Sequence, residues 1–120
     1  MNNLFENNDA IFSNDKLYRY ALWRIWDDEK PKIMFIGLNP STANELKNDP
    51  TIRRVIRFAT DWGYGGVYMM NLFAYVTAYP SELKKCNDPI KDNNWYLNGV
   101  SKKCKDILFC WGSFKEAKQR

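Results

Sequence analysis

The feature of this sequence that most constrains its fold is a short apolar run that stops at a turn. Residues 33–36 read IMFI, and residues 37–41 continue as GLNPS. An unbroken apolar run of this length is typical of a strand buried on both faces, as in a parallel sheet. Proline cannot continue a central strand, because it has no N–H to donate to a neighbouring strand. We therefore expect a central strand that places Asn39 at its carboxyl end.

A helical pattern follows this loop. Asp49 and Pro50 have the character of a helix cap followed by a proline in the first turn. Apolar residues then recur at intervals of three and four as far as Trp62, which predicts an amphipathic helix. The next apolar run, residues 67–73, predicts a second parallel strand with Asn71 near its end. Together these segments predict one βαβ unit.

The remaining segments continue the alternation of strands and helices. Residues 74–89 predict a long connection, residues 90–104 a second helix and residues 107–111 a third buried strand. Residues 18–26 mix charged residues with aromatic and β-branched ones, which favours a strand at the edge of a sheet. The elements together predict an α/β fold, a three-layer α/β/α sandwich with a mainly parallel central sheet and an N-terminal edge strand.

The length of the chain suits one domain. It has 120 residues, of which 45% are apolar, enough for a single core. Residues 1–16 contain few apolar anchors and predict a loosely ordered N-terminal arm. Residues 17–120 predict one α/β domain that ends in a polar, helical tail.

Composition narrows the classes of function. The net charge of +4 is compatible with a polyanionic partner, although no basic block stands out. With no histidine and no CxxC pair among three cysteines, neither a metal nor another cofactor is expected. The odd number of cysteines and the absence of a signal-peptide pattern predict a cytoplasmic protein. No stretch has the character of a membrane span.

In open parallel sheets, ligands bind outside the carboxyl ends of the strands. Here those ends carry two asparagines, whose amides both donate and accept hydrogen bonds and so match the polar edge of a nucleobase. The candidate ligand-binding residues at the three strand ends are Gly37, Leu38, Asn39, Pro40, Ser41, Thr42, Asn71, Phe73, Trp111 and Gly112.

These candidates also have structural interpretations. Asn39 and Asn71 can serve as turn residues, for which asparagine is preferred. Arg53 and Arg54, on the first predicted helix, are candidates for phosphate contacts, although the pattern favours a solvated face that pairs with nearby aspartates.

Spaced motifs resemble a family known as domain of unknown function 1643, over about residues 17–113. The motifs are RYALWR at 19–24, GLNPSTA at 37–43, NDPTIRR at 48–54, WGYGG at 62–66, NLFA at 71–74, DP at 88–89 and WG at 111–112. Members of that family usually continue to a segment containing His-Pro-Leu, so the resemblance implies that this chain lacks a C-terminal segment of the family.

The GLNP motif of residues 37–40 is in turn similar to the first motif of mismatch-specific glycosylases in the uracil-DNA glycosylase superfamily. That resemblance implies that Asn39 positions the attacking water, that Asn71 reads the edge of the base, and that a ring such as Phe73 or Trp111 stacks on it. Such glycosylases commonly carry a histidine loop that stabilises the leaving base, and this sequence has no histidine. Weak hydrolysis of an N-glycosidic bond is therefore implied.

Three functions stay open at the level of sequence. The first is hydrolysis of the glycosidic bond of a nucleotide, DNA or RNA. The second is binding of a nucleotide or nucleic acid in the same cleft without chemistry. The third is an interaction domain with an exposed sheet edge. The oligomeric state is not predicted.

Overall fold

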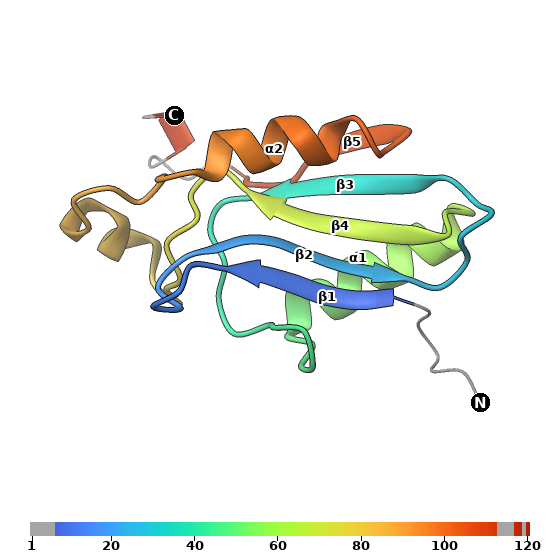
Figure 1. The fold of residues 1–120 in the computed structure, drawn as a ribbon, viewed down its shortest axis with the longest axis horizontal. Coiled ribbons are helices and arrows are strands. Elements are labelled where there is room, and N and C mark those ends of the chain that lie inside the picture. Colours follow the sequence, from blue (N-terminus) through green and yellow to red (C-terminus); the bar gives the residue numbers. More distant parts are fainter. Residues whose placement is uncertain (1–6, 113–116, 119) are drawn as a thin grey trace.

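A five-stranded mixed sheet forms the centre of the fold, with the strand order β1-β2-β4-β3-β5 (Figure 1). The computed structural model describes residues 7–112, 117–118 and 120. The strands are β1 (Asn7–Phe12), β2 (Arg19–Ile25), β3 (Lys32–Gly37), β4 (Gly66–Asn71) and β5 (Asp106–Phe109). The helices are α1 (Pro50–Asp61), the short 3-10 helix η1 (Pro80–Lys85) and α2 (Asn93–Ser101).

The predicted three-layer sandwich with a mainly parallel sheet, as in uracil-DNA glycosylases, is wrong. The pairings β1–β2 and β2–β4 are antiparallel, and only β3–β4 and β3–β5 are parallel. Each face of the sheet carries one α-helix among the described residues, not a layer of helices. The β1–β2 pairing is antiparallel because a short loop joins the two strands, and a parallel pair needs a long crossover connection.

β1 lies within the stretch expected to form a loose arm. Its sequence, NNDAIF, contains asparagine and aspartate, which are depleted in strands, so propensity gave no strand signal. Backbone pairing with β2 overrides that propensity. As a result β2 is an inner strand and β1 takes the edge position predicted for residues 18–26.

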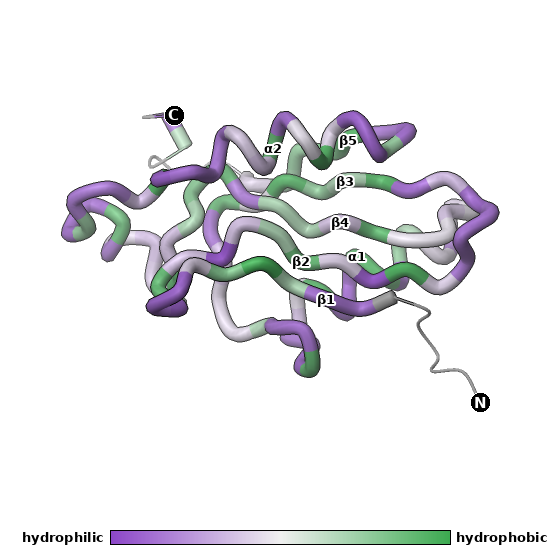
Figure 2. Tube along the Cα trace, in the orientation of Figure 1, coloured by the Kyte–Doolittle hydropathy of each residue, from purple (hydrophilic) through white to green (hydrophobic). Residues whose placement is uncertain are grey.

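The βαβ unit predicted from the central stretch is present. β3 and β4 are parallel neighbours joined through α1. The buried side of α1, with Ile52 and Val55, packs on Phe35 and Met69 of the sheet. Figure 2 shows the hydrophobic residues of the strands in the middle of the molecule and hydrophilic residues in most of the loops. The sheet therefore has a well-formed core on its α1 side.

The other face is covered less completely. α2 contributes Val100 to a second core cluster with Met34 and Met70. A third strand is present as predicted, and β5 pairs in parallel with β3. The prediction that this strand is buried is wrong, since Phe109 is 65% exposed. Most of the predicted tail after Gly112 lies outside the described residues. Within the described part of the chain, no helix has the length and apolar character needed to cross a bilayer.

Candidate functional site: a cavity beside Arg19

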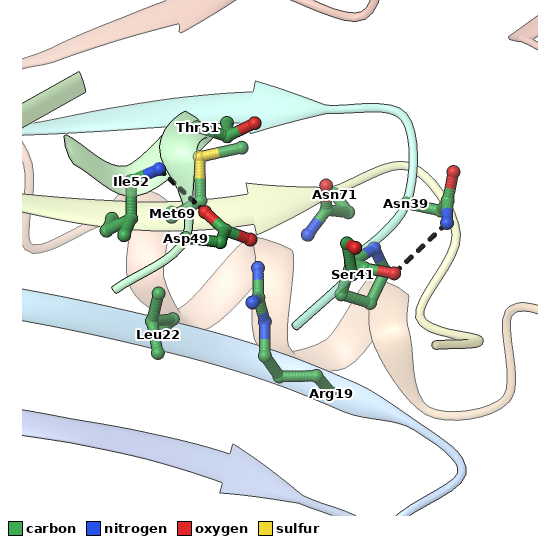
Figure 3. A pocket seen from close by; sticks show the side chains of 10 residues that line it. Arg19, Leu22, Asn39, Ser41, Asp49, Thr51, Ile52, Met69 and Asn71 are labelled. Carbon is green, nitrogen blue, oxygen red and sulfur yellow. Dashed lines mark hydrogen bonds between the residues drawn. The ribbon is translucent and has the colours of Figure 1, made fainter. Parts of the chain in front are cut away.

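A small cavity lies at the carboxyl ends of β3 and β4, on the α1 side of the sheet. Its volume is about 40 Å³, and it is partly open to solvent. Because one water needs roughly 10–15 Å³ of such volume, the cavity can hold about three waters or one polar group of a ligand, but not a whole nucleobase. The polar side chains that line it are Arg19, Asn39, Ser41, Asp49, Thr51 and Asn71 (Figure 3).

Arg19 reaches the cavity through a β-bulge in β2. The register of the β1–β2 pairing shifts at Tyr20, an extra residue between the paired positions Arg19 and Ala21. Tyr20 stacks on Tyr96 of α2, and Ala21 belongs to the core cluster on the α2 side, so two consecutive residues face the same side. Bulges redirect the side chains beside them. Here the bulge turns Arg19 to the α1 side, where the cavity lies.

The guanidinium of Arg19 is buried but incompletely hydrogen-bonded. The residue is 4% exposed, and its Nη1 donates to the carbonyl oxygen of Ala43 at 3.1 Å. Its Nη2 donates to the side-chain oxygen of Asn71 at 3.2 Å, with the Asn71 amide oriented so that its nitrogen donates to the carbonyl oxygen of Met70. Its Nε is buried and has no acceptor among the described residues. Arg19 therefore has a spare donor.

Burial also changes the acidity of this side chain. Removal from water lowers the pKa of Arg19 to about 10, because the charged form is no longer hydrated, while the negative charge of Asp49 acts in the opposite direction. Arg19 therefore remains a cation at neutral pH. The two side chains form no direct ion pair in the part of the chain that the structure describes.

Asp49 forms another wall of the cavity and begins α1. Its Oδ1 accepts from the backbone N–H of Ile52 at 2.9 Å, and its Oδ2 accepts from that of Ala43 at 3.3 Å. The first contact is the helix cap expected from the Asp-Pro signal. Figure 3 shows the guanidinium of Arg19 pointing from β2 towards Asp49 and Asn71. The cavity thus places a buried cation near a buried carboxylate.

Asn39 lines the same cavity, but its amide nitrogen is already engaged. Nδ2 donates to the carbonyl oxygens of Thr77 at 2.6 Å and Pro40 at 3.1 Å. These two acceptors fix the orientation of the amide, so Oδ1 is the atom left free, and no described residue donates to it. Asn39 therefore ties the loop after β3 to the segment after β4, and its Oδ1 is left without a donor among the described residues.

Asn71, the last residue of β4, is held from both faces of the sheet. On the α1 side its amide contacts Arg19. On the α2 side the fully buried Asn93 donates through Nδ2 to the backbone oxygen of Asn71 at 2.6 Å. A Cβ added to Gly37 would lie 2.9 Å from the side-chain amide of Asn71, so glycine leaves room for this amide. Asn71 has therefore little freedom to move.

Residues 19–120, most of the chain and every polar residue of the cavity, match the family described as protein of unknown function (DUF1643). The chain belongs to this family. No curated protein and no solved structure matches it. The resemblance to this family seen in the sequence motifs is confirmed, whereas the more distant resemblance to uracil-DNA glycosylases stays a prediction.

The structure brings four of the predicted site residues of this DUF1643 domain to the cavity: Asn39, Pro40, Ser41 and Asn71. Gly37 lies next to it and makes room for Asn71.

The other predicted site residues lie elsewhere. Leu38 and Phe73 are buried in an apolar cluster, against which Trp111 packs. Gly112 is exposed and does not line the cavity, and Thr42 lines a separate surface hollow. Arg53 and Arg54 are exposed on the outer side of α1.

Sequence reasoning missed Arg19 and Thr51 as cavity residues of the DUF1643 domain and gave Asp49 only its capping role. Charged residues in the RYALWR stretch indicated an edge strand, because alternation places every second residue on the same face. The bulge at Tyr20 breaks that alternation. A signal for Asp49 was present in the cap motif, but it does not reveal that the capping carboxylate also faces a cavity.

Proposed function

We propose that this DUF1643 domain is a binding module for a nucleotide or nucleic acid and that its cavity receives the polar edge of a base. The observation that carries the proposal is the buried guanidinium of Arg19, whose Nε has no acceptor among the described residues. A buried donor without a partner costs about 1–3 kcal/mol. Nε has almost no surface open to the cavity, so a ligand oxygen would reach it, and recover this cost, after a small shift of the side chain. Arginine donors match the carbonyl oxygens at base edges.

The charge of the cavity favours a neutral group over a phosphate. Arg19 and Asp49 contribute opposite charges, so a phosphate with two negative charges would be repelled by the carboxylate. Donors are available from Arg19, Ser41 and Thr51, and the hydroxyls of Ser41 and Thr51 can also accept. The edges of guanine and uracil present a carbonyl oxygen beside an N–H, which suits such a mixed lining. The volume of about 40 Å³ admits that edge and leaves the ring outside.

Binding is tested with guanosine and uridine 5′-monophosphate by isothermal titration calorimetry, with ribose 5-phosphate as the ligand that lacks a base. Wild-type protein should bind the nucleotides and not ribose 5-phosphate. Arg19→Lys keeps the charge but loses Nε and the planar donor set, so it should weaken binding by about tenfold, within the roughly 1–3 kcal/mol of one specific contact.

Two further variants make this test decisive. Ser41→Ala removes one hydroxyl from the lining and serves if Arg19→Lys does not fold; it should weaken nucleotide binding in the same direction. Lys103→Arg, an exposed change distant in sequence from the cavity lining, is the control and should bind as the wild type does. Equal affinity for ribose 5-phosphate and the nucleotides, or unchanged affinity in both cavity variants, would refute the proposal.

Hydrolysis of an N-glycosidic bond is a second candidate. It is favoured by Asn39, which lines a cavity large enough for water and whose Oδ1 has no donor in the described part of the chain. It is less well supported than binding, because both oxygens of Asp49 already accept backbone hydrogen bonds and an amide does not accept a proton near neutral pH.

Hydrolysis is tested with labelled oligonucleotides that contain uracil, hypoxanthine or a mismatch, and with the free nucleotides. The candidate predicts slow release of the base by the wild type and loss of that release in Asn39→Ala. Identical background rates in the two proteins would end it.

A further inference from the structure

The outer face of α1 carries three arginines that the cavity does not use. Arg53, Arg54 and Arg57 are all exposed. The ion pair found among the described residues joins Lys30 to Asp27 at 3.9 Å, so none of the three arginines is paired with a carboxylate there. The expectation that they pair with nearby aspartates is therefore not met. Three unpaired cations within two turns of one helix give this face a positive charge.

Two exposed aromatic rings lie on the same helix. Phe58 is 42% exposed and Trp62, the residue that caps α1, is 52% exposed. Their rings are stacked, with centroids 5.4 Å apart and planes 11° apart. Trp62 also stacks on Phe35 of β3, at 6.3 Å, which fixes the pair to the core. Phe58 is thus a partly exposed ring with a rigid support behind it.

Helical spacing puts the charges and the rings side by side. Residues four apart lie above one another on a helix, so Arg54, Phe58 and Trp62 form one row, and Arg53 and Arg57 form the neighbouring row. A polymer that follows the helix axis would meet cations and rings together.

This surface begins where the cavity ends. Thr51, in the first turn of α1, is exposed and also lines the cavity. It precedes Arg54 by three residues and Phe58 by seven, so all three lie on the same side of the helix. The cavity holds only one polar group of a ligand, and the rest of a longer ligand would lie on this face.

We propose that the outer face of α1 binds single-stranded nucleic acid, with the arginines on phosphates and Phe58 stacked on a base. This deepens the proposed function and rests on it for the base edge in the cavity. A basic surface next to supported aromatic rings is what sequence-tolerant binding of a single strand requires. A duplex keeps its base faces covered, so stacking on Phe58 selects the single strand. The net charge of +4 agrees with an anionic partner.

The proposal is tested by fluorescence anisotropy with labelled twelve-residue oligo-dT and oligo-rU over a range of salt concentrations. The double variant Arg53→Gln/Arg57→Gln should bind more weakly, and its salt slope should fall by about 1.4, because each phosphate that is no longer neutralised accounts for about 0.7. The control Lys102→Gln/Lys103→Gln removes the same charge from exposed positions at the end of α2 and should keep the wild-type slope. An equal decrease in both double variants would overturn the proposal.

Stacking is tested separately with Phe58→Ala. It should weaken binding of the single strand by about five- to 150-fold, the range typical of removing one stacked base, without changing the salt slope. Unchanged affinity would remove Phe58 from the site and overturn the proposal. Poly-glutamate, used as a competitor at matched charge, should compete poorly. Effective competition would assign the face to acidic polypeptides instead.

The two proposals fail in different ways. Nucleotide binding that depends on Arg19, with strand binding that ignores Arg53, Arg57 and Phe58, would support the cavity and overturn the α1 surface. Strand binding that depends on the α1 residues, with no effect of cavity variants on any nucleotide, would do the reverse. Binding of either DNA or RNA supports the α1 surface if it depends on Arg53, Arg57 and Phe58, and binding of neither overturns it.

Discussion

Two buried arginines on β2 differ in whether every guanidinium nitrogen has a hydrogen-bond acceptor. Arg24 is 1% exposed, and each of its nitrogens has an acceptor. Nε donates to the side chain of Asn48 at 3.0 Å, and Nη2 donates to the carbonyl oxygen of Asn44 at 2.5 Å. Arg19, five residues earlier, is buried almost as completely but leaves Nε without an acceptor in the described structure.

The difference separates a structural cation from a candidate binding cation. Arg24 holds the loop that precedes α1, because its acceptors at positions 44, 47 and 48 all belong to that loop. Arg19 faces a cavity and has donor capacity that the fold does not use. Burial and charge are alike in the two cases, so neither identifies a site by itself. The feature that distinguishes Arg19 is an unsatisfied donor on a side chain that lines a cavity.

The largest expected effect comes from removing Arg24. Arg24→Met should lower the free energy of unfolding by at least about 3 kcal/mol, because several partly buried acceptors lose their donor at once. Urea unfolding followed by tryptophan fluorescence measures it. A decrease below about 1 kcal/mol would show that the loop is held by other interactions and would weaken the comparison.

The matching change at the other arginine should cost less. Arg19→Met removes a cation that is already poorly satisfied, and methionine fills similar space, so we expect a decrease of about 1 kcal/mol in the same unfolding experiment. Nucleotide binding should be lost together with the guanidinium. If Arg19→Met destabilises the protein as much as Arg24→Met, both arginines are structural and the distinction fails.

Glycine substitutions probe the packing of the amide next to Arg19. A Cβ at Gly37 would lie 2.8 Å from Cε of Met69 and 2.9 Å from the side-chain amide of Asn71. Gly37→Ala should therefore displace the Asn71 amide, destabilise the protein by roughly 1 kcal/mol and weaken nucleotide binding. Gly99→Ala is the control, because its Cβ meets nothing within 4 Å and lies inside α2. It should stabilise the protein by about 0.5–1 kcal/mol and leave binding unchanged.

The smallest expected effect is that of pH on nucleotide binding. Burial lowers the pKa of Arg19 only to about 10, so the guanidinium keeps its proton at neutral pH, and the chain has no histidine to titrate there. Affinity should change by less than about twofold between pH 6 and 8. A group with a lowered pKa loses its proton as pH rises through that value, so Arg19 would weaken binding only above about pH 10. A strong change near pH 7 would indicate another titrating group.

Sequence reasoning was most successful in the stretch from β3 to β4. There the apolar runs are unbroken, the turn residues are strong and the helix has both a cap and a regular apolar spacing, so local signals and tertiary structure agree. The same reasoning failed for β5, because an edge strand and a buried strand can have the same composition. Its exposure depends on where α2 lies, and that is not encoded in the run itself.

For the candidate site, the sequence indicated the correct end of the sheet, the carboxyl ends of β3 and β4, but not Arg19. Residues two apart on a strand point to the same face of the sheet, so Asn71 could be placed on the same face as Val67 and Met69. Asn39 reached the cavity, yet its amide serves mainly as a tie between two loops. Arg19 could not be inferred, because its direction depends on one extra residue in a strand, and nothing local marks that residue.

That extra residue has a mechanical consequence. Tyr20 stacks on Tyr96 of α2, and Asn93 at the start of α2 donates a hydrogen bond to the last carbonyl oxygen of β4. Through these two interactions, a helix on one side of the sheet is connected to the guanidinium and the amide on the opposite side. A molecule that binds at the exposed Trp95 and displaces α2 is therefore expected to shift Arg19 and Asn71 on the α1 side of the sheet.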